Sequence, residues 1–162
     1  MTDFGSLIRL LSASGVEFII VGGAAAVAHG SARLTEDLDI VYRHTRENVA
    51  RLVAALSPYR PYLRGAPPGL PFAWDEETIW RGLNFTLTTS LGALDLLGEI
   101  TGGGDYDKLR PDSIPIQLYG VECLCLDLGR LIQVKRAAGR PKDLDAVAEL
   151  EAMLEERKGG PN

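Results

Sequence analysis

The stretch Asp37-Leu38-Asp39-Ile40-Val41 alternates acidic with apolar residues, a pattern typical of a β-strand. Successive side chains of a strand point to opposite faces, so Asp37 and Asp39 share one face while Leu38 and Ile40 share the other. Two carboxylates on one face repel each other unless a cation lies between them, and Mg²⁺, which prefers oxygen ligands, meets that need. The alternative is an exposed edge strand that carries two solvated acids.

A second stretch, Ala-Leu-Asp-Leu-Leu at residues 93–97, places Asp95 inside an apolar strand. An unpaired charge is expensive to bury there, and a neighbouring strand that carries Asp37, Asp39 and a metal ion would explain it. Three acids on two adjacent strands form a site able to hold two Mg²⁺ ions and a triphosphate. The alternative for Asp95 is an acid that reaches solvent or caps a turn.

Gly22 and Gly23 follow the apolar run 16–21, which predicts a buried strand, and precede a short helix predicted over 24–29. Adjacent glycines let the backbone approach a ligand closely, and a helix N-terminus offers free N–H groups to an anion. The pair therefore indicates a phosphate-binding turn shortly before Asp37. The alternative is a turn with no ligand.

Lys135 falls on the apolar stripe of a helix predicted over 128–138, at helical spacing from Leu131 and Ile132. Its ammonium group either extends past the helix to solvent or points toward phosphates. Residues 128–142 contain five basic residues and no acid, which indicates a local basic patch. Asp143 lies in the first turn of the last helix, where the helix dipole favours an acid whatever its function.

The order of the predicted elements indicates an α+β fold: a mixed β-sheet flanked by helices, with two C-terminal helices. One domain is expected over 1–157, followed by a disordered tail at 158–162. Five of the nine prolines lie in 57–71, so this segment is predicted to be a long loop, and the glycines at 102–104 a loop or hinge. Helices are predicted over 3–13, 24–29, 46–56, 128–138 and 141–156, and strands over 16–21, 37–42, 83–89, 93–97, 114–119 and 121–126.

The composition is ordinary for one globular domain: 162 residues, 46% hydrophobic and 24% charged. No apolar run is long enough for a membrane span and the N-terminus lacks the pattern of a signal peptide, so a cytoplasmic protein without membrane contact is expected. The formal net charge of −5 argues against sequence-independent coating of nucleic acid. Cys123 and Cys125 are interpreted as apolar strand residues rather than zinc ligands.

Several of these motifs together resemble the nucleotidyltransferase superfamily with the DNA polymerase β-like fold, and most of all the AbiEii-type nucleotidyltransferases of bacterial toxin–antitoxin pairs. The resemblance covers roughly residues 16–150. The residues that carry it are Gly22-Gly23-Ala24, His29-Gly30, Arg33-Leu34-Thr35, Asp37-Leu38-Asp39-Ile40, Leu94-Asp95-Leu96-Leu97, and the run from Lys135-Arg136-Ala137-Ala138 through Gly139-Arg140-Pro141-Lys142 to Asp143-Leu144.

The resemblance implies an Mg²⁺-dependent transfer of a nucleoside monophosphate from an NTP to an acceptor hydroxyl, with release of pyrophosphate. It implies that Asp37, Asp39 and Asp95 hold one or two metal ions, and that Asp95 helps to activate the attacking hydroxyl. Gly22 and Gly23 match the phosphate-binding turn, and Lys135 and Asp143 match later motifs, with Lys135 directed toward the nucleotide.

The acceptor class remains open at this point. RNA, for instance a tRNA modified by a toxin with an antitoxin protein as partner, is one version, and a small antibiotic-modifying adenylyltransferase is another. A different class of function is a catalytically silent member that binds a nucleotide or a partner protein. Intact acids favour the enzyme, whereas Ala24, which stands where many members carry serine, favours the silent module.

Overall fold

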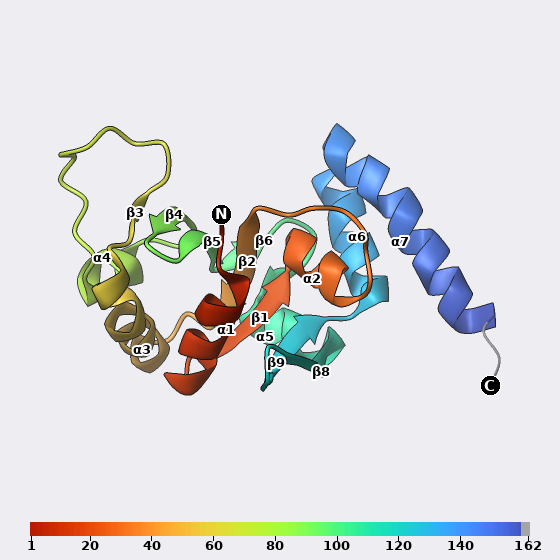
Figure 1. Ribbon diagram of the computed structural model, residues 1–162, viewed down its shortest axis with the longest axis horizontal. Helices are drawn as coiled ribbons and strands as arrows, with labels where there is room; N and C mark the ends of the chain where they lie inside the picture. The colour runs from red at the N-terminus through yellow and green to blue at the C-terminus, as the bar shows by residue number, and fades with distance from the viewer. Residues whose placement is uncertain (160–162) are drawn as a thin grey trace.

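A mixed seven-stranded sheet forms the centre of the protein in the computed structural model, which describes residues 1–159 (Figure 1). Its strand order is β3-β4-β5-β2-β1-β9-β8. The pairs β1–β9 and β2–β5 are parallel, and the other neighbours are antiparallel. The expected mixed sheet flanked by helices is confirmed. The strands are β1 (Phe18–Val21), β2 (Asp37–Tyr42), β3 (Tyr62–Leu63), β4 (Phe85–Thr89), β5 (Gly92–Leu97), β8 (Ser113–Leu118) and β9 (Val121–Leu126).

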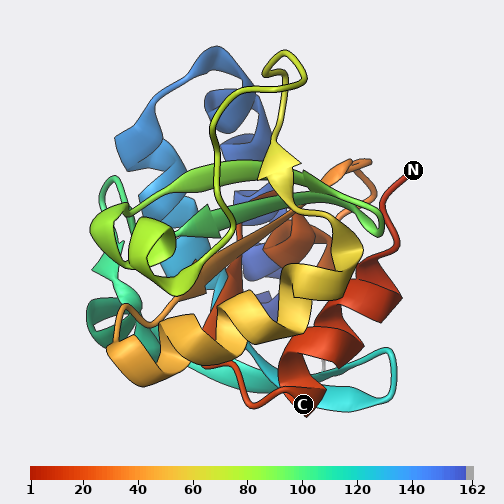
Figure 2. The ribbon, with the colours of Figure 1, turned by 90° about the vertical axis from the view of Figure 1, so that its left-hand side faces the viewer.

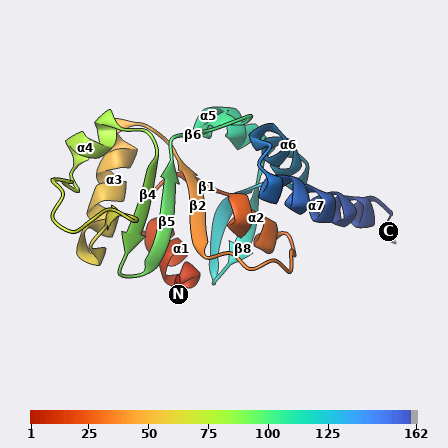
Figure 3. The same ribbon diagram turned by 90° about the horizontal axis from the view of Figure 1, so that it is seen from above.

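Two pairs of helices lie at opposite ends of the molecule. Figures 1 and 3 show α3 and α4 at one end and α6 and α7 at the other, with β1, β2 and β5 between them. Asp3, Thr45, Asp75 and Asp127 cap the N-termini of α1, α3, α4 and α6 with their side-chain oxygens. The helices are α1 (Phe4–Ala13), α2 (Gly22–Ala28), α3 (Arg46–Leu56), α4 (Glu76–Arg81), α5 (Tyr106–Leu109), α6 (Leu128–Ala138) and α7 (Pro141–Gly159), with 3₁₀ turns η1 (Ser57–Tyr59) and η2 (Arg110–Asp112).

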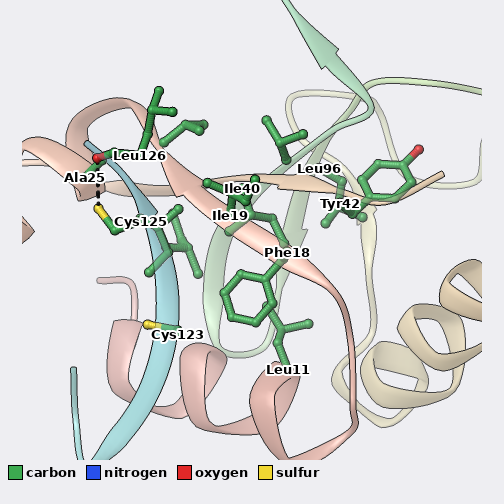
Figure 4. Close-up of a cluster of buried hydrophobic side chains, with 14 of the residues drawn as sticks. Leu11, Phe18, Ile19, Ala25, Ile40, Tyr42, Leu96, Cys123, Cys125 and Leu126 are labelled. Atoms are coloured by element: carbon green, nitrogen blue, oxygen red, sulfur yellow. Dashed lines mark hydrogen bonds between the residues drawn. The ribbon is translucent and has the colours of Figure 1, made fainter. Parts of the chain in front are cut away.

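The apolar core lies between the central strands and the helices that pack on them. Figure 4 shows Leu11 of α1 close to Phe18 of β1, and Ile40 and Tyr42 along β2. Cys123 and Cys125 are buried free thiols of β9, and burial raises the pKa of the Cys125 thiol to about 12. The interpretation of this pair as apolar strand residues is therefore confirmed.

The proline-rich segment 57–71 is more ordered than the predicted loop. It begins with η1 and then supplies β3, which pairs with β4 at the edge of the sheet, the position where proline-flanked strands are tolerated. Only the chain after β3 projects as an open arc before α4 (Figures 1 and 2). Helix α4, at Glu76–Arg81, lies in a stretch where the sequence pattern predicts neither a helix nor a strand.

Other boundaries also differ from the predictions, among them the following. Helix α2 begins at Gly22 rather than at 24, directly after β1. The glycines at 102–104 are part of a small hairpin, in which β6 (Glu99–Ile100) pairs with β7 (Gly104–Asp105). Helix α7 continues to Gly159, so Lys158 and Gly159 are helical rather than disordered; residues 160–162 lie outside the described part of the chain.

Across residues 1–159, none of the helices combines the length and the apolar character that crossing a membrane requires.

Candidate active site

Three carboxylates meet on one face of the central sheet, and we call Asp37, Asp39 and Asp95 the carboxylate cluster. Strands β2 and β5 are neighbours, as expected from the sequence; they run parallel, and Asp39 lies directly opposite Asp95. The edge-strand alternative is wrong, because β2 lies between β5 and β1 and the side chains of Leu38 and Ile40 are fully buried on its other face. Strand alternation therefore places all three acids together.

Asp39 is the acid most strongly affected by this arrangement. Burial, a hydrogen bond with Asp95 and the negative charges of Asp95 and Asp37 raise the pKa of Asp39 to about 7, while the charge of Lys135 opposes the shift. A carboxyl group in such surroundings ionises fully at neutral pH only when a cation is added. The cluster therefore has the electrostatic character of a cation-binding site.

The glycine pair lies so close to this cluster and to Thr35 that neither position has room for a side chain. Gly22 has φ +62°, and a Cβ atom on it would overlap the carboxylate of Asp39, which is paired with the adjacent Val21. A Cβ on Gly23 would lie 2.8 Å from Thr35 Oγ1. The first turn of α2 has no side-chain cap, so its N–H groups lack a side-chain partner. The backbone of this turn therefore lies directly beside the cluster, as a phosphate-binding turn requires.

Thr35 and Ala24 bear on the position after the glycine pair, where many nucleotidyltransferases carry a serine and this chain carries Ala24. Thr35, one of the residues that carry the family resemblance, brings a hydroxyl to the glycine turn. Ala24 instead faces an apolar pocket of about 300 Å³ on the other side of α2, and it lines neither of the cavities beside Asp39.

Helices α6 and α7 face the cluster with a second group of charges. Lys135 is partly buried, and burial lowers the pKa of its ammonium group, although Asp143 and Asp39 oppose the shift. Asp143 is buried and accepts hydrogen bonds from Arg140 Nε at 2.6 Å and Nη2 at 3.2 Å. Burial disfavours the Asp143 carboxylate, but these bonds and the charges of Arg140 and Lys135 outweigh it and lower its pKa.

Two cavities of about 420 and 260 Å³ adjoin between the cluster and these helices. Both are lined by Gly22, Asp39, Lys135, Arg140 and Asp143, and we call them together the α6 cleft. Their combined size is within the usual range for a small-molecule site, roughly 300–1,000 Å³. Asp95 lines neither cavity, so the expected site residues meet in one region but do not all face the same space.

The predicted basic patch is divided by the fold. Arg140 and Lys142 line the α6 cleft with Lys135. Arg130 and Arg136 do not line it, and they form ion pairs with Asp112 and Glu151. The clustering of bases in the sequence therefore overstates the number that face the site.

Arg64, which follows β3, is a site residue that sequence reasoning missed. Its Nη2 donates to Asp95 Oδ1 at 2.7 Å and its Nη1 to Asp37 Oδ2 at 3.4 Å. Nothing in the local sequence signals this contact, because Arg64 stands in the proline-rich segment predicted as a loop. Only the pairing of β3 with β4, and of β4 with β5, brings it to the carboxylates.

The donor chemistry of the cluster fits a hard divalent ion such as Mg²⁺: three carboxylates on one sheet face, where burial and the neighbouring carboxylates raise the pKa of Asp39. In residues 1–159, however, no three His, Cys, Asp or Glu side chains already converge as ligands of one ion. Arg64 is the cation that contacts two of the three acids.

Comparisons with known proteins place the fold. No family model matches the chain, and no curated protein matches its sequence. Three solved structures share its architecture, each at low sequence identity. The crystal structure of the lincosamide antibiotic adenylyltransferase LnuA, bound to lincomycin, has a TM-score of 0.63 at 15% identity, over 93% of this chain and 96% of that chain.

The second structure, a protein from Thermotoga maritima assigned as a nucleotidyltransferase, has a TM-score of 0.54 at 14% identity, over 92% of this chain and 94% of that one. The third, an antigenic nucleotidyltransferase-like protein from Paracoccidioides brasiliensis, also has a TM-score of 0.54, at 15% identity over 93% of this chain and 73% of that one. The chain therefore has the fold of nucleotidyltransferases, and the AbiEii-type resemblance stays a prediction.

Proposed function

We propose that the protein is an Mg²⁺-dependent nucleotidyltransferase that transfers a nucleoside monophosphate from an NTP to an acceptor hydroxyl. The observation that carries this proposal is the register of β2 and β5, which sets Asp39 opposite Asp95 beside a glycine turn with no room for a side chain. The shared fold supports it.

Each side chain has a role in this proposal. Asp37, Asp39 and Asp95 would hold one or two Mg²⁺ ions, which supply charge neutralisation for the phosphates when bound. Gly22 and Gly23 let the backbone approach the triphosphate.

Lys135 would place its charge on the triphosphate, and the buried Asp143 holds Arg140 at the cleft beside it. In the reaction, the acceptor oxygen forms a bond to the α-phosphorus while the bond from that phosphorus to the bridging oxygen breaks. Pyrophosphate leaves, and the hydroxyl proton passes toward Asp95.

For the acceptor we favour a small molecule with a free hydroxyl. The likeness to the lincosamide adenylyltransferase extends over nearly the whole of both chains, and the acceptor of that protein is a small antibiotic. RNA is the second candidate, and Arg33, Lys142 and Arg140 along the cleft favour it, since they offer charge to a phosphate backbone. An antitoxin partner belongs to this second candidate alone.

The test is an incubation of the protein with each α-labelled NTP and Mg²⁺, in the presence of lincosamides and other hydroxyl-bearing antibiotics, or of total RNA. Label on a small molecule supports the first candidate, and label on RNA supports the second. Asp39→Asn is the control and should give no label. If the protein binds an NTP but labels no acceptor, the catalytically silent alternative is favoured and our proposal is wrong.

A further inference from the structure

Arg64 is anchored to the sheet on one side and to the carboxylate cluster on the other. Its backbone N–H donates to Thr86 O at 2.9 Å, which continues the pairing of β3 with β4. Its Nε and Nη2 both donate to Leu87 O, at 3.2 and 2.6 Å. These bonds hold the guanidinium over β4, and from there it reaches Asp95 and Asp37.

The guanidinium of Arg64 is bonded to two carboxylate oxygens that a metal ion at the cluster would bind. Asp95 Oδ1 and Asp37 Oδ2 both accept hydrogen bonds from Arg64, and Asp39 is the one acid of the cluster without a contact to it. This agrees with the absence, in the described chain, of three acids that converge on one point. A positive group between two carboxylates satisfies them in place of a divalent ion and repels such an ion.

We propose that Arg64 is a built-in counter-cation that competes with the divalent ion for Asp37 and Asp95. In the metal-free protein it positions both carboxylates, and the ion enters the cluster as Arg64 gives up one or both of them. The bonds to Leu87 O keep the guanidinium beside the site, on the side away from the α6 cleft. This inference rests on the proposed function, because that function requires a metal at the cluster.

The competition can be measured without catalysis, by titrating the nucleotide-free protein with Mn²⁺ and following free Mn²⁺ by electron paramagnetic resonance. Arg64→Gln removes the charge, so Mn²⁺ should bind at least about tenfold more tightly than to the native protein. A positive charge within a few ångströms changes the binding of a proton to a carboxylate by about one to three orders of magnitude, and a divalent ion competes for the same oxygens. Arg81→Gln removes an exposed arginine from α4 and is the matched control. Its Mn²⁺ affinity should equal that of the native protein.

Arg64→Lys guards against a folding failure of the first variant. Lysine keeps the charge but lacks the planar fork that bonds Leu87 O and two carboxylates together, so its Mn²⁺ affinity should lie between those of Arg64→Gln and the native protein. Circular dichroism establishes that each variant is folded. A role for Arg64 in holding β3 alone would change thermal stability without changing Mn²⁺ affinity.

Asp39→Asn separates failure of this inference from failure of the proposed function. If native Mn²⁺ binding is lost in Asp39→Asn, but Arg64→Gln and Arg64→Lys bind no more tightly than the native protein, the competition is wrong and the metal site stands. If Asp39→Asn binds Mn²⁺ as tightly as the native protein, the cluster is not the metal site. The metal requirement of the proposed function then fails, and the inference fails with it.

Discussion

The two sides of the carboxylate cluster treat their cations differently. On the α6 side, Lys135 forms no ion pair within 4.0 Å among residues 1–159, and burial weakens its hold on a proton. On the β3 side, Arg64 is fully engaged by Asp95, Asp37 and Leu87 O. The comparison indicates that the ammonium group of Lys135 is available to an anionic ligand, whereas the guanidinium of Arg64 already neutralises Asp95 and Asp37. We therefore expect nucleotide on the α6 side and a small-molecule acceptor on the β3 side.

The largest expected effect comes from removing a carboxylate between the two sides. Asp39→Asn and Asp37→Asn should each lower the transfer rate by about a thousandfold or more, because each removes a proposed ligand of an ion that would contribute several kcal/mol to the barrier reduction. The rate of labelled NMP transfer measures it. Asp145→Asn, an exposed acid of α7, is the control and should leave the rate unchanged. Near-native transfer by either cluster variant would contradict the assignment.

The cluster should also make the metal-free protein sensitive to pH. The pKa of Asp39 is raised from 3.8 to about 7 in the folded state, so the protonated form is favoured by folding. Its contribution to stability is fully present below about pH 4 and is lost as the pH rises to about 7, a change of a few kcal/mol. Urea unfolding in EDTA across this range should show the decline in the native protein. Asp39→Asn should lack that part of the slope, and an identical slope would disprove the cause.

Lys135 tests the α6 side alone. Lys135→Met keeps most of the apolar stem and loses the charge, so NTP binding should weaken by about 1.5–3 kcal/mol, or roughly ten- to a hundredfold. Stability without ligand should be unchanged or higher, because a partly buried ammonium without a partner is costly. Calorimetric titration with NTP and Mg²⁺ measures the affinity. Lys158→Met, at the exposed end of α7, is the control; equal affinities in all three proteins would remove Lys135 from the site.

The smallest effect is expected from the arc that follows β3. Replacing Pro67–Leu70 with two glycines leaves Arg64 and the residues of β3 in place. It alters the chain beyond them, whose Pro67 O and Leu70 N–H bond the hydroxyl of Tyr62. Acceptor selection should change by a few-fold, with NTP affinity unchanged, because Lys135 lies on the other side of the cluster. Kinetics with two acceptors measure the ratio, and a change confined to NTP affinity would reverse our placement of the two substrates.

The sequence by itself determined the parts whose physics is local. Alternation fixed which residues of 37–41 share a face, the glycine pair marked the turn, and helical spacing placed Lys135 toward the interior. These inferences held because strand and helix periods act over a few residues. They singled out the three acids without knowledge of strand order, and the resemblance to nucleotidyltransferases came from the motifs around those acids.

Only the tertiary structure decided what those acids contact. Arg64 lies 31 residues before Asp95 and 27 after Asp37, and it meets them because β3, β4 and β5 pair in a particular register. The proline-rich sequence around Arg64 favours a loop, but backbone pairing with β4 stabilises a short edge strand there. Register depends on hydrogen bonds and packing between distant segments, so the neighbour of a carboxylate cannot be read from the residues beside it.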